Sequence, residues 1–385
     1  MKTFIRRFSI LLMLLMCLSS GVRYFVKAEV LTDTNLNDVV AIDVDCSAVG
    51  MAMLELDSGR LIMQKNKDKR LPMASTTKIM TAITVIEHTK SLDKTVVIPD
   101  EAVGVEGSSI YLQRGEELSI RDLLYGLMLQ SGNDCAVALA IITGGSVENF
   151  AEMMNTLAAQ IGANNTHFVN PHGLHDDSHY TTAYDLALIS AYAMKNPVFA
   201  EIVGTKVHKT TWKDHDYGRV IVNKNKIISI FEGGNGIKTG FTKKAGRCLV
   251  SSAQRDGKTV ICVVLNCGPM FEECSRLMNL AFKSLVMSDI ICTNVSICQV
   301  KVENGKEDFV DVGLESIVNY PLSEDEAKRL EFKFDLPEEV SAPVKKGERI
   351  GKINIYLDNR LLFSEDLFTI NSVERKTFWD WLKGE

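Results

Sequence analysis

A serine and a lysine stand three residues apart, as Ser75 and Lys78, at the start of an apolar run. The apolar side chains of that run recur at helical spacing: Met73, Met80, Ile83 and Ile86. Positions i and i+3 are neighbours on one helix face, so the hydroxyl and the amine can meet. Serine needs a base to become a nucleophile at neutral pH, and lysine can be that base if burial or nearby cations lower its pKa. Alone, the pair is a weak signal that arises by chance in many chains, and it favours a solvated serine and a surface lysine.

A second polar motif, Ser131-Gly-Asn133, interrupts two apolar segments that we expect to be helices, 118–129 and 136–142. A short polar break between two buried helices holds its side chains at one fixed point. Taken alone, the same residues could be an ordinary helix cap, because Ser, Asn and Asp are preferred there.

A third motif, Lys238-Thr-Gly240, lies in the glycine-rich stretch 233–242. It could be a turn with a solvated lysine, but glycines on both sides, Gly240 among them, suggest a close backbone approach to a ligand. The next two segments, 247–253 and 258–266, predict a β-hairpin. We therefore expect the motif at the beginning of, or just before, an edge strand that can pair with an extended peptide.

Three histidines, His172, His175 and His179, stand near Asp176 and Asp177 and raise the possibility of a metal site. The neighbouring proline and glycine mark a loop, without the helical or strand spacing of usual metal motifs. We therefore do not predict a metal ion. Either of two threonines, Thr181 or Thr182, is expected to cap a helix over 183–194.

The chain has 385 residues and a net charge of -6, with no basic stripe, so we expect no nucleic-acid partner. Residues 1–28 predict a signal peptide: Lys2, Arg6 and Arg7 precede an apolar core that is too short to span a bilayer. We place cleavage after Ala28. The mature protein is then expected to work outside the cytoplasmic membrane.

Eight cysteines would remain after that cleavage. In an exported chain, pairs such as Cys292 with Cys298 or Cys267 with Cys274 are conceivable. Several cysteines lie inside apolar runs, however, where a cysteine usually behaves as a small hydrophobe. We favour mostly free, buried thiols.

Elements around the motifs suggest how they are positioned. Segments 49–55 and 61–63 predict a hairpin that leads into the Ser75 helix, and 271–286 predicts a helix that closes the sheet. From Asn294 to Ser372, short strand-like runs alternate with turns and predict a small all-β domain. Residues 373–385 form a tail that we expect to be amphipathic. Its apolar side chains would either insert into a membrane surface or dock on the β domain: Phe378, Trp379, Trp381 and Leu382.

Together, the three motifs in this order resemble those of the penicillin-recognising serine enzymes. Four surrounding stretches, 71–81, 170–174, 179–185 and 236–242, resemble the low-molecular-mass penicillin-binding proteins that are serine-type D-alanyl-D-alanine carboxypeptidases. The resemblance covers nearly the whole mature chain. It implies an α/β (α+β) catalytic domain of the serine β-lactamase/transpeptidase type over 29–293, with a central antiparallel sheet and a helical cluster. A small all-β domain and an amphipathic tail would follow, as in that family.

The resemblance also implies the chemistry. Ser75 would attack the carbonyl between the two terminal D-alanines of a peptidoglycan stem pentapeptide, releasing D-alanine and leaving an acyl-enzyme that water hydrolyses. Lys78 would take the serine proton, and Ser131 would pass a proton to the leaving nitrogen, with Lys238 as a further member of the network. Asn133 would hold the peptide. β-Lactams would acylate the same serine, and no metal or cofactor would be needed.

The third motif would bind the end of the substrate. Lys238 and Thr239 would hold the terminal carboxylate, a role suited to a cation and a hydroxyl. The backbone N–H groups of Ser75 and Phe241 would form the oxyanion hole. Gly240, which lies between Thr239 and Phe241, would belong to the same binding site. Such a hole contributes about 3 kcal/mol per donor.

Three alternatives remain at this point. A β-lactamase shares the motifs, but the Glu-x-x-Leu-Asn string of one class is missing between Ser131 and Lys238; the nearest stretch runs from Glu152 to Asn155. A non-catalytic penicillin-binding wall module would be expected to carry a damaged motif, and all three are intact. A DD-endopeptidase acting on cross-links would use the same chemistry. For location, we expect a peripheral protein on the outer face of the cytoplasmic membrane, held by its tail.

Overall fold

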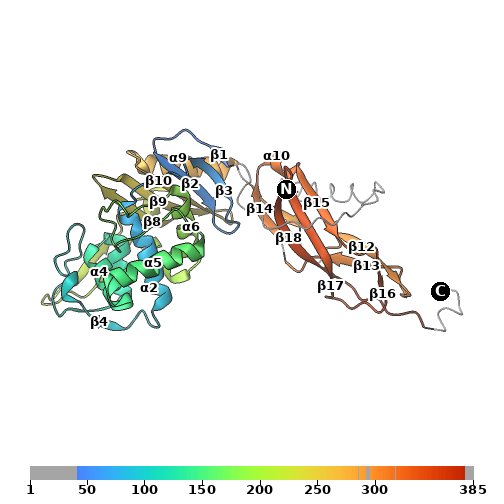
Figure 1. Cartoon of the computed structure of the whole chain (residues 1–385), viewed down its shortest axis with the longest axis horizontal. Coiled ribbons are helices and arrows are strands. Elements are labelled where there is room, and N and C mark those ends of the chain that lie inside the picture. Colours follow the sequence, from blue (N-terminus) through green and yellow to red (C-terminus); the bar gives the residue numbers. More distant parts are fainter. Residues whose placement is uncertain (1–40, 285, 292–294, 317, 378–385) are drawn as a thin grey trace. The chain divides into compact units, whose positions relative to one another are not determined.

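A computed structural model describes residues 41–284, 286–291, 295–316 and 318–377. These residues form two compact units, divided after Ser284, and each has its own hydrophobic core. Figure 1 colours the first unit from blue to yellow and the second in orange and red. The predicted signal peptide (residues 1–28) and the apolar tail side chains Phe378, Trp379, Trp381 and Leu382 lie outside the described residues.

The first unit is built on a six-stranded sheet. Its strands, in sheet order, are β1 (Ile42–Asp43), β3 (Leu61–Lys65), β2 (Gly50–Glu55), β10 (Lys258–Leu265), β9 (Gly246–Arg255) and β8 (Gly234–Thr242). All neighbours are antiparallel except β1 and β3. Both predicted hairpins, β2–β3 and β9–β10, are confirmed, and β2 pairs with β10 to join the two ends of the unit.

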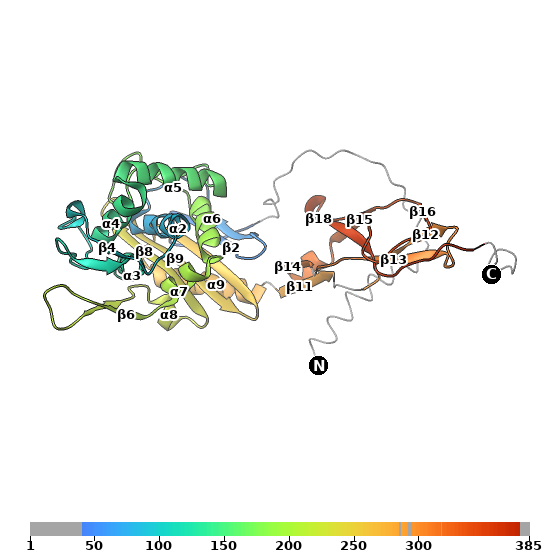
Figure 2. The ribbon, with the colours of Figure 1, turned by 90° about the horizontal axis from the view of Figure 1, so that it is seen from below.

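Helices cover both faces of this sheet, which is why every residue of β2 and β10 is buried. Helix α9 (Met270–Ser284) packs against β9 and β10, and α6 (Ala183–Met194) packs against β2 and β10. Figures 1 and 2 show α9 on one side of the sheet and α6 with the other helices on the opposite side. The α6 helix begins where predicted, because the Thr182 hydroxyl accepts a hydrogen bond from Asp185 N at 3.0 Å.

The helical cluster next to α6 carries the first two motifs. It contains α2 (Lys78–His88), α3 (Ile120–Tyr125), α4 (Asn133–Gly144), α5 (Val147–Ile161) and α7 (Pro197–Gly204). Two short hairpins, β4 (Thr95–Val97) with β5 (Glu117–Ser119) and β6 (Val207–Thr210) with β7 (Arg219–Val222), flank it. Helix α8 (Ile227–Ile230) precedes β8. Several of these elements, including α5, α7 and β6–β7, were not predicted.

Three of the predicted helices have different bounds. The segment predicted as 136–142 is longer at both ends, as α4 runs from Asn133 to Gly144. The segment 118–129 is not one helix: Ser119 caps α3, and the chain then widens into a π-helical turn, Gly126–Gln130. A Cβ at Gly126 would stand 2.6 Å from the Cys135 sulfur, so this turn packs closely against α4. The predicted helix 271–286 ends at Ser284, because Val286 begins strand β11 (Val286–Ile291), which pairs with β14 (Val318–Leu322) of the second unit. That unit therefore begins ahead of Asn294.

The second unit is the expected small all-β domain. Its six-stranded sheet runs, in order, β15 (Leu330–Asp335), β17 (Arg349–Leu357), β18 (Arg360–Thr369), β13 (Phe309–Gly313), β12 (Cys298–Glu303) and β16 (Glu339–Ser341). One helical turn, α10 (Glu324–Ala327), follows β14 and is held by a capping box of Ser323 and Glu326. The first tail residues run extended along the domain, where Val373 exchanges backbone hydrogen bonds with Val344.

The seven cysteines in the described residues are free thiols, and six of them are buried. The possible Cys267–Cys274 disulfide is not formed, and Cys292 lies outside the described residues. Within the same part of the chain, no single helix is long and apolar enough to cross a membrane. In that part of the chain, only α6 and α7 taken together are long and apolar enough, and they are bent by 105°. Buried core helices can be equally long and apolar.

Candidate active site

Ser75 stands on a short 3-10 helix, η1 (Ala74–Thr77), that leads into α2. The backbone of strand β8 lies directly against this turn. A Cβ added at Gly240 would stand 3.1 Å from Met73 O, Ser75 N and Thr76 N. A side chain at this position would therefore push the backbones of the first and third motifs apart by a few tenths of an ångström, and glycine allows the closer approach.

Lys78 is fully buried beside the serine. Its Nζ lies 3.1 Å from Ser75 Oγ, 2.7 Å from Asn133 Oδ1 and 2.6 Å from the carbonyl of His172. The pKa of Lys78 is well below its usual 10.5. Burial is the main cause, and the positive charge of Lys238 lowers the pKa further. A neutral Lys78 amine can still donate to Asn133 and His172 while its lone pair accepts the proton of Ser75.

The second motif follows the π-helical turn. Ser131 ends that turn in the left-handed conformation, with φ of 65°, and Asn133 begins α4. Asn133 also holds a neighbouring segment, because its backbone N–H donates to Ser108 O at 2.7 Å and its Nδ2 donates to Glu106 O at 2.6 Å. In the described residues, no hydrogen bond joins Ser131 to Lys238; the Lys238 amine donates instead to Thr239 O at 2.9 Å.

Lys238, Thr239, Gly240 and Phe241 all lie on β8, at the open edge of the six-stranded sheet. The prediction of an edge strand is confirmed, although the motif sits inside the strand and not before it. Lys238 is 1% exposed, whereas the Phe241 side chain is 64% exposed. Burial, together with the charge of Lys224, lowers the pKa of Lys238 to about 7.

Lys224 is a third cation near the site and was not predicted. Its Nζ donates to Gln130 O at 2.8 Å and lies 3.5 Å from Ser108 Oγ, so it bridges the two segments that flank Asn133. Burial lowers its own pKa. The surrounding sequence, Asn223-Lys-Asn225, offers no signal for this role, because the contacts reach segments 94 and 116 residues away.

A buried ion pair of Arg219 and Glu116, also unpredicted, supports the segment that Asn133 holds. Arg219 Nη2 donates to Glu116 Oε2 at 2.8 Å, and the Nη1 of Arg219 bonds to Oε1 of the same carboxylate. The guanidinium also donates to Ile110 O at 2.8 Å and Tyr111 O at 2.9 Å. On the other side, the Asp134 carboxylate accepts from Ile110 N at 3.1 Å. The segment is thus fixed from both sides.

Comparison with known proteins decides the family. Residues 37–268 match peptidase family S11, D-alanyl-D-alanine carboxypeptidase, and residues 288–375 match the C-terminal domain of penicillin-binding protein 5. The chain belongs to the S11 D-alanyl-D-alanine carboxypeptidases. As such, it is a serine-type carboxypeptidase and a low-molecular-mass penicillin-binding protein, as the sequence motifs implied.

The chain is similar to curated relatives and solved structures over most of their length. The chain is 30% identical to the D-alanyl-D-alanine carboxypeptidase DacF of Bacillus subtilis, over 87% of this chain and 88% of the relative. The crystal structure of penicillin-binding protein 5 from Haemophilus influenzae superposes with a TM-score of 0.71 at 27% identity, covering 86% of this chain and 99% of that one. The Streptomyces K15 DD-transpeptidase superposes with a TM-score of 0.59 at 35% identity, covering 63% of this chain and 100% of that one.

The three histidines considered for a metal site, His172, His175 and His179, do not gather around a common point. His172 Nδ1 accepts from Leu174 N at 3.1 Å, His175 lies 3.2 Å from Asp177, and His179 contacts Thr77. Within the described ranges, no group of three or more His, Cys, Asp or Glu side chains is arranged to hold a metal ion.

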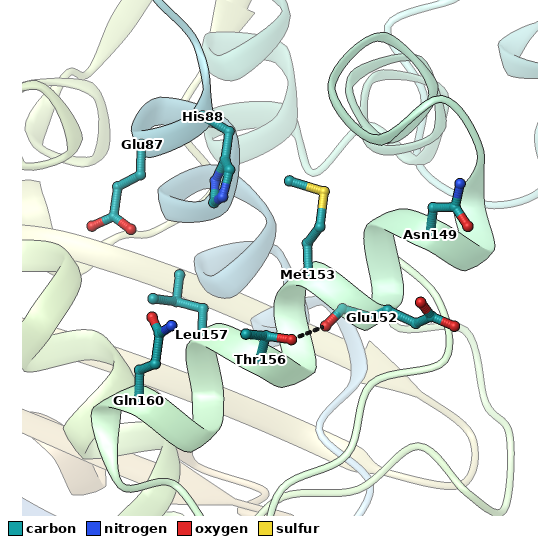
Figure 3. Close-up of a pocket in the computed structure, with 8 residues that line it drawn as sticks. All are labelled: Glu87, His88, Asn149, Glu152, Met153, Thr156, Leu157 and Gln160. Atoms are coloured by element: carbon teal, nitrogen blue, oxygen red, sulfur yellow. Dashed lines mark hydrogen bonds between the residues drawn. The ribbon is translucent and has the colours of Figure 1, made fainter.

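A surface pocket of about 400 Å³ lies elsewhere on this carboxypeptidase, between the end of α2 and helix α5 (Figure 3). It is lined by Glu87, His88, Asn149, Glu152, Met153, Thr156, Leu157 and Gln160. Lys78 begins α2 and His88 ends it, so about 15 Å of helix separates the pocket from the Lys78 position. None of the predicted site residues lines it.

Proposed function

We propose that Ser75 is the nucleophile that removes the terminal D-alanine from peptidoglycan stem pentapeptides, with Lys78 as its base. The observation that carries this is the contact at 3.1 Å between Nζ of the fully buried Lys78 and Oγ of the partly accessible Ser75. Because burial favours the neutral amine, Lys78 is ready to accept the serine proton. Asn133 and His172 O orient the amine through their own hydrogen bonds.

The backbone N–H groups of Ser75 and Phe241 are proposed to form the oxyanion hole. The close approach at Gly240 supports this, because it brings β8 next to the amide of Ser75. Each donor of such a hole contributes about 3 kcal/mol to transition-state stabilisation.

The end of the peptide is proposed to bind along β8. Lys238 and Thr239 would hold the terminal carboxylate, and the open edge of β8 would pair with the extended peptide. Asn133 would hold the peptide from the other side. Ser131 is buried next to Asn133 and would pass a proton to the leaving nitrogen. Hydrolysis of the acyl-enzyme by water then restores Ser75.

The experiment is D-alanine release from diacetyl-Lys-D-Ala-D-Ala by a protein of residues 29–385, with Ser75→Ala measured beside it. Release that disappears in the variant supports the proposal and places the nucleophile. Labelling by penicillin without D-alanine release would point to a DD-endopeptidase that needs cross-linked peptide. Fast turnover of a β-lactam without release would point to a β-lactamase.

Export and membrane association belong to the same proposal. The charged and apolar N-terminal segment supports export, and the aromatic residues of the tail support attachment to the outer face of the cytoplasmic membrane. Deleting residues 378–385 is the appropriate test, because it leaves the pairing of Val373 with Val344 intact. A deleted protein that stays wholly with the membrane fraction would show that the tail is not the anchor.

A further inference from the structure

His179 lies between two segments of the active site and forms a hydrogen bond with each. Its ring is buried, with 3% of the residue exposed. On one side, Val169 N donates to His179 Nδ1 at 3.1 Å. On the other side, His179 Nε2 lies 2.8 Å from Thr77 Oγ1. Thr77 belongs to the turn that carries Ser75.

The direction of each hydrogen bond follows from these contacts. A backbone N–H can only donate, so Nδ1 of His179 carries no proton. Burial lowers the pKa of His179 to about 4, so the ring is neutral near pH 7 and its proton is on Nε2. Nε2–H therefore donates to Thr77 Oγ1, and the Thr77 hydroxyl donates in turn to Ala74 O at 2.8 Å. Histidine, threonine and the Ala74 carbonyl form one continuous chain of hydrogen bonds.

Ala74, at the end of that chain, has an unfavourable backbone conformation. Its φ is 49°, in the left-handed region, which costs a residue with a side chain about 1–2 kcal/mol. It immediately precedes Ser75, so its conformation sets the direction of the serine. A strained residue of this kind persists only where its surroundings hold it. The Thr77 hydroxyl holds its carbonyl, and Gly173 packs against the same oxygen, where an added Cβ would stand 1.9 Å away.

The other partner of His179 leads to the lysine. Val169 opens the segment that runs through His172 to Gly173, and the carbonyl of His172 accepts a hydrogen bond from Lys78 Nζ at 2.6 Å. One imidazole therefore supports both the turn that carries Ser75 and the segment that holds the Lys78 amine.

We propose that His179 is a positioning residue for acylation, which acts through Thr77 and the 169–173 segment to keep Ser75 Oγ within reach of Lys78 Nζ. It touches neither the substrate nor the reacting atoms. This inference rests on the roles proposed for Ser75 and Lys78. Because a displacement of about 1 Å can reduce a rate about 10²-fold, loss of the chain should lower the rate of acylation without weakening substrate binding.

The test begins with Thr77→Val, which keeps the shape of the side chain and removes its hydroxyl. We expect kcat for diacetyl-Lys-D-Ala-D-Ala, and the rate of acylation by a fluorescent penicillin, to fall by about 10²-fold with little change in KM. Thr77→Ser keeps the hydroxyl and should restore the rate. The matched control is Thr84→Val, the same change two turns later on α2, at a buried hydroxyl that has no hydrogen-bond partner in the described residues.

The histidine is tested by two substitutions. His179→Gln retains a donor for Thr77 and should keep more activity than His179→Asn, which retains an acceptor for Val169 N. The double variant Thr77→Val/His179→Asn should be no slower than the slower single variant, because both changes break one chain. Rates that multiply in the double variant would overturn the proposal, and so would a folded Thr77→Val protein that is acylated at the wild-type rate.

The proposed function and the role of His179 can be contradicted separately. A wild-type protein that penicillin does not label at Ser75 would overturn the proposed function together with the role of His179. Normal labelling of wild type and of Thr77→Val alike would overturn only the role of His179. If His179→Asn does not fold, as judged by thermal unfolding, the comparison of Thr77→Val with Thr77→Ser decides the question alone.

Discussion

The amine of Lys78 lies 3.1 Å from the hydroxyl of Ser75, and the lysine is completely buried while the serine remains partly accessible. This contrast matters chemically, because the proposed base is removed from water while the proposed nucleophile stays open to a substrate. An ammonium group in this position would use all three of its protons on Ser75, Asn133 and the carbonyl of His172. The neutral amine gives up one of those bonds and gains the capacity to accept the serine proton.

The pH dependence of the reaction should have two limbs. The pKa of Lys78 is well below 10.5, so kcat/KM should rise with pH through that lowered pKa as the base becomes neutral. In its proposed role, Lys238 must stay charged to bind the carboxylate, and its pKa is about 7, so kcat/KM should fall again at higher pH. A pH profile of D-alanine release measures both limbs. Lys238→Arg should lose the alkaline limb, because a guanidinium does not titrate there; an unchanged limb would contradict this assignment.

Lys238 should also reduce the stability of the fold. Its folded pKa of about 7 is lowered from 10.5, so the penalty is fully present below pH 7. It then decreases as pH rises toward 10.5, because the unfolded state binds more protons in that window. Lys238→Met should therefore raise the free energy of unfolding by roughly 3–5 kcal/mol below pH 7 and by much less above pH 10. Urea unfolding at several pH values tests this, and a pH-independent gain would contradict it.

The close approach of β8 to the nucleophile should be sensitive to one methyl group. In Gly240→Ala, the new Cβ would stand 3.1 Å from Met73 O, Ser75 N and Thr76 N, so β8 and the turn would have to separate by a few tenths of an ångström. We expect acylation by penicillin to slow by about 10²-fold while the protein stays folded. Gly268→Ala is the matched control, because no atom lies within 4 Å of its Cβ. Equal acylation rates in the two variants would contradict the importance of this contact.

The ion pair of Glu116 and Arg219 should be costly to break from one side. Burial alone raises the pKa of Glu116, but hydrogen bonds from Arg219 and from the backbone more than offset this, and the pKa is lowered. Arg219→Met leaves a buried carboxylate unpaired and should cost about 3–5 kcal/mol in the free energy of unfolding at pH 7. The stability that Glu116 contributes is present above its unfolded pKa of 4.5 and is lost as pH falls through its lower folded pKa.

Urea unfolding of Glu116→Leu, of Arg219→Met and of the double variant Glu116→Leu/Arg219→Met would measure the coupling free energy between the two side chains. The double variant leaves no buried charge, so it should be more stable than Arg219→Met alone. A double variant that loses the sum of the two single losses would contradict a direct coupling between these side chains.

The predictions that succeeded depend on residues close together in the sequence. Ser75 and Lys78 are in contact because three residues nearly complete one helical turn. Thr182 caps α6 because a threonine before a helix can accept a bond from the first turn. The β9–β10 hairpin forms around residues 256–257, between two runs of strand-forming side chains. In each case, local geometry alone decides the contact.

The sequence by itself determined the family and predicted which groups do the chemistry, since the three motifs carry the residues proposed as the nucleophile, its base and the carboxylate site. Only the tertiary structure decided what holds these groups. The carbonyl of His172 that accepts from Lys78 comes from 94 residues away, His179 reaches Thr77 across 102 residues, and Arg219 reaches Glu116 across 103. Such contacts depend on how helices pack on the sheet, which local spacing does not specify. Buried polar groups need hydrogen-bond partners, and only the packed backbone of the folded chain brings these distant partners together.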